Sequence, residues 1–148
     1  MNDTIFNIIL ADDDEDDRML FSEALEEISI QTTLSLFKHG QELLDYLFQP
    51  NVKLPNLIFL DINMPILNGI QCLTEIRNNS LFKDVFIAMY STSSSEKDIE
   101  DSFQNGASVY INKPSCFNKL CEIVEKTLKV NWHEHTSNLN KDTFLLRI

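Results

Sequence analysis

The sequence predicts a doubly wound α/β fold, in which five parallel strands form one sheet with helices on both faces. Two observations support this: short apolar runs alternate along the chain with longer amphipathic stretches, and several of the runs are almost continuously hydrophobic. Such runs are typical of parallel strands that are buried on both sheet faces. The chain has 148 residues, of which 43% are hydrophobic, which is enough to bury the core of one domain.

Five segments are predicted as strands because each is short, apolar and bounded by polar or turn-forming residues. The first, third and fourth are the most hydrophobic, with the sequences IFNIILA, NLIFLD and VFIAMYS. In chain order the five segments are residues 5–11, 33–37, 56–61, 85–91 and 108–113.

Helices are predicted between the strands from apolar residues that recur with a helical period. In the first helix, Leu20, Ala24 and Ile28 are spaced i, i+4 and i+8, with Phe21 and Leu25 beside them. The apolar stripe of the last helix consists of Phe117, Leu120, Cys121, Val124 and Leu128.

Glycines mark the boundaries of three helices. Gly40 and Gly69 lie near the starts of the second and third helices, and Gly106 follows the fourth, where a helix is expected to end. Five successive strand–helix units then imply right-handed crossovers and helices on both faces of the sheet.

The composition argues against several classes of partner. The net charge of −11 and the pI near 4.5 disfavour binding to nucleic acid or to anionic membranes. No apolar run reaches the ~18 residues of a membrane span, and the N-terminus lacks the positive region of a secretory signal. Cys72, Cys116 and Cys121 form no CxxC pair, so we expect buried or idle thiols in a cytoplasmic protein.

Polar residues stand where four of the predicted strands end, and the carboxyl ends of parallel strands share one edge of a sheet. Ligands of open α/β folds bind at this edge. We therefore expect a site formed by Asp12 and Asp13 after the first strand, Asp61 and Asn63 after the third, Ser91 and Thr92 after the fourth, and Lys113 after the fifth.

These residue types suit phosphoryl transfer to a carboxylate. Asp61 is an anion at neutral pH and a potential nucleophile. Clustered carboxylates repel one another, by roughly 4 kcal/mol for a pair ~4 Å apart at an effective dielectric of ~20. Mg²⁺ offsets this repulsion because it binds one or two carboxylates together with phosphate oxygens. Lys113 offers a positive charge to another phosphate oxygen, and Ser91 offers a hydrogen bond.

Six consecutive acids, Asp12 to Asp17, divide into two groups in this interpretation. Asp12 and Asp13 end a buried strand and are expected to bind metal. Asp14, Glu15, Asp16 and Asp17 are expected to be solvated on the first turn of the next helix, where the helix dipole favours negative charge.

The chain resembles the receiver domain of two-component response regulators. The matching segments are NIILADDD, LIFLDINMPILNGI, AMYSTSSSEKDI and GASVYINKP, and the resemblance covers about residues 5–129. It implies a flavodoxin-like (βα)5 sheet with strand order 2-1-3-4-5. A receiver domain would span residues 1–129. Residues 130–148 would be a C-terminal extension packed on the domain or on a partner, because they include Trp132, Phe144, Leu145, Leu146 and Ile148.

The resemblance also implies roles for the acidic residues. Asp61 would accept the phosphoryl group and share in binding Mg²⁺. Asp13 would bind the metal directly, Asp12 through water, and Asn63 through its backbone carbonyl.

The remaining implied roles concern the last two strands. Lys113 would pair with a phosphoryl oxygen, and Ser91, with Thr92 beside it, would contact the phosphate. Tyr110 would swing inward as the hydroxyl moves, and the Lys113–Pro114 peptide would be cis. Tyr90 departs from the aliphatic residue usual at its position, and strand alternation would point it away from the site.

The function implied is that of a stand-alone, single-domain response regulator, a phosphoprotein of a phosphorelay. A sensor histidine kinase or a histidine phosphotransfer protein would phosphorylate Asp61. The output would be contact with a downstream protein, or homodimerisation, through the face of helix 4, strand 5 and helix 5. The protein would not be an enzyme beyond self-catalysed phosphoryl transfer and slow autodephosphorylation.

Two other functions are alternatives. A phosphohydrolase of the haloacid dehalogenase type needs a carboxylic acid two residues after the nucleophile, where this chain has Asn63. A flavodoxin-like flavin binder is suggested by the hydroxyl-rich STSSSEKD segment. Flavodoxins have such a loop after the first strand, where this chain has acids that repel phosphate.

Overall fold

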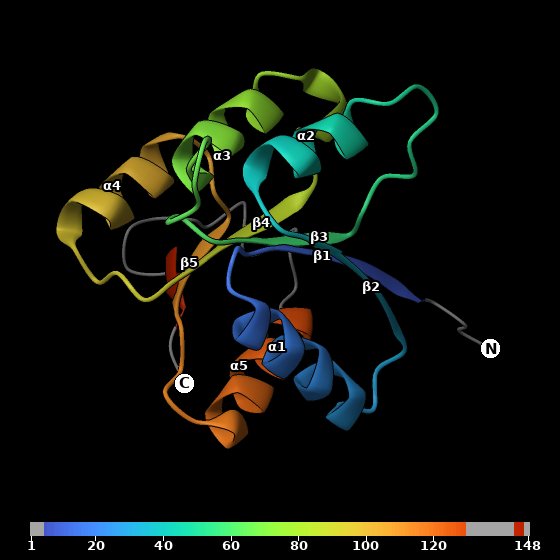
Figure 1. Ribbon diagram of the computed structural model, residues 1–148, viewed down its shortest axis with the longest axis vertical. Helices are drawn as coiled ribbons and strands as arrows, with labels where there is room; N and C mark the ends of the chain where they lie inside the picture. Colours follow the sequence, from blue (N-terminus) through green and yellow to red (C-terminus); the bar gives the residue numbers. More distant parts are fainter. Residues whose placement is uncertain (1–4, 130–143, 147–148) are drawn as a thin grey trace.

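The computed structural model describes residues 5–129 and 144–146, which form one parallel sheet flanked by helices (Figure 1). The strands are β1 (Phe6–Ala11), β2 (Thr32–Phe37), β3 (Leu57–Leu60), β4 (Phe86–Ser91), β5 (Val109–Asn112) and β6 (Leu145–Leu146). The helices are α1 (Glu15–Glu27), α2 (Gly40–Leu47), α3 (Gly69–Arg77), α4 (Glu96–Gln104) and α5 (Phe117–Lys129), with a 3-10 turn, η1, at Ser80–Phe82.

The strand order is β2-β1-β3-β4-β5-β6, and each neighbouring pair is parallel. The predicted doubly wound fold with order 2-1-3-4-5 is therefore confirmed, and each predicted strand agrees with the observed one to within a residue at either end. β6 was not foreseen. It comes from the C-terminal segment and extends the sheet beyond β5.

Two apolar layers hold the helices on the sheet. Helices α1 and α5 cover one face, and α2, α3 and α4 lie on the other (Figure 1). β3 and β4 are buried along their whole length, which explains why their sequences are continuously apolar.

The α1–α5 layer differs from the prediction at one position. Phe21, Ala24 and Leu25 are buried, whereas Leu20 is 42% exposed. The buried stripe of α1 is thus narrower than the sequence pattern indicated, because Phe21 fills the space against Phe59 and Tyr90.

The glycines occupy the expected boundaries. α2 begins at Gly40, α3 begins at Gly69, and Gly106 follows α4 with a φ of 94°. A Cβ atom at residue 69 would overlap the Asp61 carbonyl oxygen, and the Gly69 N–H donates to the Ile62 carbonyl at 2.8 Å. The start of α3 can therefore lie directly against the end of β3.

Within the described ranges, 5–129 and 144–146, no helix has both the length and the apolarity that a bilayer crossing requires. Of the apolar residues noted in the extension, Phe144 is buried and packs on the domain. Trp132 and Ile148 lie outside the described residues, as do the side chains of Leu145 and Leu146.

Candidate functional site

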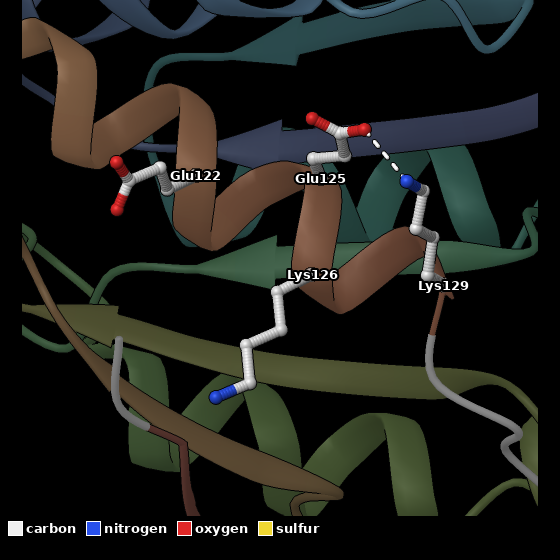
Figure 2. Close-up of a pocket in the computed structure, with 4 residues that line it drawn as sticks. All are labelled: Glu122, Glu125, Lys126 and Lys129. Atoms are coloured by element: carbon white, nitrogen blue, oxygen red, sulfur yellow. Dashed lines mark ion pairs between the residues drawn. The ribbon is translucent and has the colours of Figure 1, made fainter.

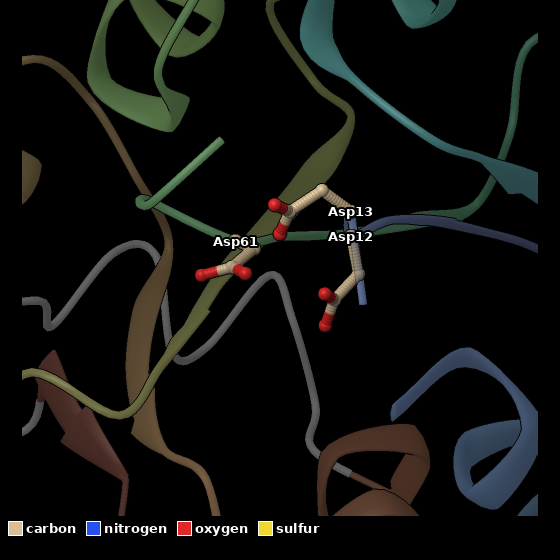
Figure 3. Close-up of side chains that lie close together, drawn as sticks. All are labelled: Asp12, Asp13 and Asp61. Atoms are coloured by element: carbon tan, nitrogen blue, oxygen red, sulfur yellow. The ribbon is translucent and has the colours of Figure 1, made fainter. Parts of the chain in front are cut away.

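Three carboxylates meet at the carboxyl edge of the sheet (Figure 3). Asp12 follows β1 and Asp61 follows β3, and the Asp61 N–H donates to the Ala11 carbonyl at 3.0 Å. One oxygen from each of Asp12, Asp13 and Asp61 lies within 4.8 Å of the other two. Asp12 and Asp61 are buried, whereas Asp13 is exposed to solvent.

Backbone amides orient the two buried carboxylates. The Asp14 N–H donates to Asp12 Oδ1 at 3.0 Å, and the Asn63 N–H donates to Asp61 Oδ1 at 3.2 Å. Each aspartate thus binds the amide two residues further along the chain, a local turn that short acidic side chains favour. Oδ2 of each residue is left to face the cation of the site.

That cation is the ammonium of Lys113, which follows β5 and is only 9% exposed. Its Nζ lies 2.8 Å from Asp17 Oδ2, 2.9 Å from Asp12 Oδ2 and 3.3 Å from Asp61 Oδ2. The Lys113 N–H donates to the Ser91 carbonyl at 2.8 Å, which ties the end of β5 to the end of β4. The predicted approach of Lys113 to Asp61 is therefore present.

Burial controls the protonation of the carboxylates. It raises the pKa of Asp61 to about 6, with Asp12 adding to the rise and Lys113 opposing it. Burial also raises the pKa of Asp12, against the opposing effect of Lys113. Burial alone would lower the pKa of Lys113, but its pairing with Asp17, Asp12 and Asp61 outweighs this and raises it. The site therefore holds its negative charge at a cost in stability.

The donor set fits a hard divalent cation. Within the described residues Asp12 Oδ2 is buried and accepts no hydrogen bond of good geometry, although it forms the ion pair with Lys113. A buried carboxylate oxygen without a hydrogen bond is costly unless a cation lies beside it, and here the Lys113 ammonium does so. Three converging carboxylates of this kind suit Mg²⁺, which prefers oxygen ligands.

The hydroxyl side of the site is built on the loop after β4. Ser91 is fully buried, and its Oγ accepts the Ser93 N–H at 3.0 Å. Thr92 is exposed. Tyr110 is fully buried, and its hydroxyl donates to the Ser93 carbonyl at 2.8 Å. Tyr110 thus has an inward position, while its predicted movement stays a prediction.

Three details of the site differ from the sequence-based expectations. The Lys113–Pro114 peptide is trans, since the described chain contains no cis peptide, so the cis expectation is wrong. The trans form is the intrinsically preferred one, and Lys113 reaches the carboxylates with it. Tyr90 was expected to point away, yet its ring lies 5.3 Å from Lys113 Nζ. Its ring packs with Phe21 and Phe59 on the α1–α5 face and also contacts Lys113 of the site.

The third difference concerns Asp17, which sequence reasoning assigned to a solvated patch. The solvated position is correct for Asp14, which is the exposed N-cap of α1, and for Glu15 and Asp16, which are also exposed. Asp17 instead pairs with Lys113, 96 residues further along the chain. No local sequence pattern indicates this contact, because it depends on how the first turn of α1 faces the end of β5.

A pocket of about 520 Å³ lies on α5 and is lined by Glu122, Glu125, Lys126 and Lys129 (Figure 2). Lys129 Nζ pairs with Glu125 at 2.8 Å, and each of the two side chains is more than 40% exposed. Asp12, Asp13 and Asp61, the carboxylates that could hold a metal, do not line this pocket. We therefore assign the chemistry to the edge of the sheet.

Comparison with known proteins agrees with this geometry. The sequence matches the family model of the response regulator receiver domain over residues 8–125. It is 30% identical to the response regulator Rcp1 of Synechocystis sp. over 122 residues, which cover 80% of this chain and 83% of Rcp1.

Two solved structures that resemble this chain are also response regulators. The phosphorylated cyanobacterial phytochrome response regulator RcpA superposes with a TM-score of 0.78 at 30% identity, covering 84% of this chain and 91% of that one. The Mn²⁺-bound form of Rcp1 has a TM-score of 0.74 at 29% identity, covering 82% of this chain and 90% of that one.

Proposed function

Because this chain belongs to the response regulator receiver domain family, we propose that it accepts a phosphoryl group on Asp61 and acts as a switch in two-component signalling. The observation that carries the proposal is the convergence of Asp61 with two further carboxylates and with Lys113 Nζ, 3.3 Å away. This arrangement offers a nucleophile, a metal site and a cation to one phosphoryl group.

The donor would be the phosphohistidine of a sensor histidine kinase or of a phosphotransfer protein. A carboxylate oxygen of Asp61 attacks the phosphorus, the P–N bond breaks, and the departing imidazole takes up a proton from water. The product is an aspartyl phosphate. Lys113 holds a phosphoryl oxygen, and the Ser91 hydroxyl donates a hydrogen bond to another.

Asp12, Asp13 and Asp61, together with the Asn63 backbone carbonyl, are the groups proposed to hold Mg²⁺. A bound Mg²⁺ ion would screen the phosphoryl oxygens from these carboxylates. The three converging carboxylates support this assignment. A Mn²⁺-bound form is known for the related Rcp1, and this supports the proposal that the present chain also binds a divalent metal.

We further propose that the protein is a phosphorylation switch and not an enzyme with an external substrate. Asp61 is followed two residues later by Asn63, which cannot act as the general acid of a phosphohydrolase. Turnover would then be limited to self-catalysed phosphoryl transfer and slow loss of phosphate to water.

The output is proposed to be protein–protein contact in the cytoplasm, through the face formed by α4, β5 and α5. A cavity of about 470 Å³ on α4, lined by Glu96, Ile99, Glu100, Phe103 and Phe144, supports this face as a docking surface for a target or a second copy. The hydroxyl of Tyr110, on β5, donates to the Ser93 carbonyl in the loop after β4, which links this face to the loop that carries Ser91.

Incubation with acetyl phosphate tests the assignment of Asp61. We expect mass spectrometry of the intact protein to show one added phosphoryl group in the presence of Mg²⁺ and none in EDTA. Asp61→Asn should abolish the labelling, whereas Asp45→Asn, an exposed aspartate on α2, should leave it unchanged. Labelling that persists in Asp61→Asn would refute the proposal.

A further inference from the structure

We propose that Asp17 is a positioning residue that competes with the phosphoryl group for the ammonium of Lys113. This inference rests on the proposed phosphorylation of Asp61. It is suggested by the distances, because Asp17 Oδ2 is nearer to Lys113 Nζ, at 2.8 Å, than Asp61 Oδ2 is, at 3.3 Å.

The first turn of α1 is held where Asp17 can make this contact. The Asp17 N–H donates to the side chain of Asp14, the N-cap, at 3.1 Å. Arg18 Nη1 donates to the Asp12 carbonyl at 2.8 Å, which ties the helix to the end of β1. Asp17 is therefore fixed beside the site by its neighbours.

An ammonium group has three N–H donors. Here it pairs with three carboxylates and donates hydrogen bonds to two of them, Asp17 and Asp61. A phosphoryl group on Asp61 adds further strong acceptors and more negative charge. Lys113 can turn fully toward it only by giving up one of its carboxylates. Asp17 is the one on the solvent side, with its side chain 33% exposed, so it is the partner that water can replace.

Asp17 therefore weakens binding of a phosphoryl group by retaining the cation. Removing its charge should strengthen that binding. The neighbouring Asp16 provides a matched control, because it lies on the same helical turn, is exposed, and has no ion pair within the described part of the chain. Asp17→Asn and Asp16→Asn change the net charge equally.

The test is titration of the full chain with beryllofluoride, a mimic of the phosphoryl group, in saturating Mg²⁺, followed by ¹⁹F NMR. We expect Asp17→Asn to bind it about threefold more tightly than the wild type, and Asp16→Asn to bind it unchanged. Mg²⁺ affinity without beryllofluoride, measured by calorimetry, should change alike in both variants.

Equal tightening in the two variants would overturn the inference, since it would reflect net charge alone. Weaker binding by Asp17→Asn would also overturn it, since Asp17 would then assist Lys113. If the wild type does not bind beryllofluoride at all, the proposed function fails, which is a separate result.

A second, independent observation concerns the segment Phe144–Leu146. Its backbone pairs with β5, with Leu145 opposite Tyr110 and Leu146 opposite Ile111. Phe144 is fully buried, and its ring centroid lies 5.2 Å from that of Phe103 on α4 and 6.4 Å from that of Tyr110. The segment thus covers the free edge of β5 and part of the proposed docking face.

A continuous set of contacts joins this segment to the site. Phe144 packs on Tyr110, and the Tyr110 hydroxyl holds the Ser93 carbonyl. The Ser93 N–H in turn donates to Ser91 Oγ. This hydrogen bond uses Ser91 as an acceptor, so the Ser91 hydroxyl can still donate to a phosphoryl oxygen. The docked segment therefore contacts the residues that hold the loop carrying Ser91.

We infer that docking of Phe144–Leu146 in cis and binding of a phosphoryl group favour each other. Such a coupling is reciprocal: each event must raise the affinity of the other by the same factor. A partner that displaces the segment from β5 would then weaken phosphoryl binding, and this would link the docking face to the lifetime of the signal.

Hydrogen exchange with mass spectrometry and the beryllofluoride titration test the two directions. We expect beryllofluoride and Mg²⁺ to slow exchange in the peptide containing Phe144–Leu146 by about threefold, and Phe144→Ala to weaken beryllofluoride binding by a similar factor. Phe48→Ala, which removes a half-exposed ring packed on Phe82, is the control and should leave the affinity unchanged.

Exchange in this segment that does not respond to beryllofluoride would overturn the coupling. Protection that grows with protein concentration would overturn docking in cis, because the segment would then bind a second copy of the chain.

Discussion

Neutralising Asp61 should make the metal-free protein more stable at neutral pH. Asp61 is 4% exposed, and burial raises its pKa from 3.8 to about 6 in spite of the attraction of Lys113. One pKa unit corresponds to about 1.4 kcal/mol, so keeping this carboxylate ionised in the folded protein at pH 7 costs about 3 kcal/mol. Asp61→Asn removes the charge with little change of shape and should recover most of that amount.

The sign of the pH dependence follows from proton binding. Between pH 3.8 and about 6 the folded protein holds a proton on Asp61 that the unfolded chain has lost, so the wild type gains stability as the pH falls. The advantage of Asp61→Asn should therefore shrink from about 3 kcal/mol at pH 7 to about 1.6 kcal/mol at pH 5. A pH of 5 stays above the pI of about 4.5, which helps to keep the protein soluble.

Urea denaturation in EDTA, followed by circular dichroism, measures this difference. The control is Asp45→Asn on α2, an exposed position where the change should stay within about 0.5 kcal/mol. The reasoning would be refuted if Asp61→Asn were no more stable than the wild type at pH 7, or if its advantage were the same at both pH values.

Three further predictions use the same assay. Lys113→Ala should lower the free energy of unfolding in EDTA by about 3 kcal/mol, because Asp12 and Asp61 lose their buried counter-charge. Lys97→Ala, which breaks an exposed ion pair, should lower it by less than about 1 kcal/mol. Equal losses in the two variants would contradict this. Mg²⁺ at ten times its dissociation constant should stabilise the wild type by about 1.4 kcal/mol and Asp61→Asn by clearly less, and calorimetric titration supplies the constants. Gly69→Ala should destabilise the protein by about 2 kcal/mol and lower its Mg²⁺ affinity, because the new Cβ atom would push on the Asp61 backbone. Unchanged Mg²⁺ binding would show that this contact does not position Asp61.

Much of the site could be predicted because it depends on strand ends. In a parallel sheet, residues that follow successive strands must come to one edge, so Asp12, Asp61 and Lys113 were brought together by their places in the chain alone. The apolar runs likewise predicted the order and limits of the strands along the chain, because a strand buried on both faces needs apolar residues. Gly106 predicted the end of α4, because a positive φ favours glycine.

The tertiary structure decided the contacts between residues that have no fixed spacing in the sequence. Leu20 and Phe21 compete for the same side of α1, and only packing against Phe59 and Tyr90 shows which one is buried.

Two such contacts bear on function. The pairing of Asp17 with Lys113 depends on the angle at which α1 leaves the sheet, and the pairing of Phe144–Leu146 with β5 depends on an uncovered sheet edge. Acids in a run and apolar residues near a terminus look alike in sequence whether they meet water or protein. Only the fold determines which of them faces a cation and which covers a strand.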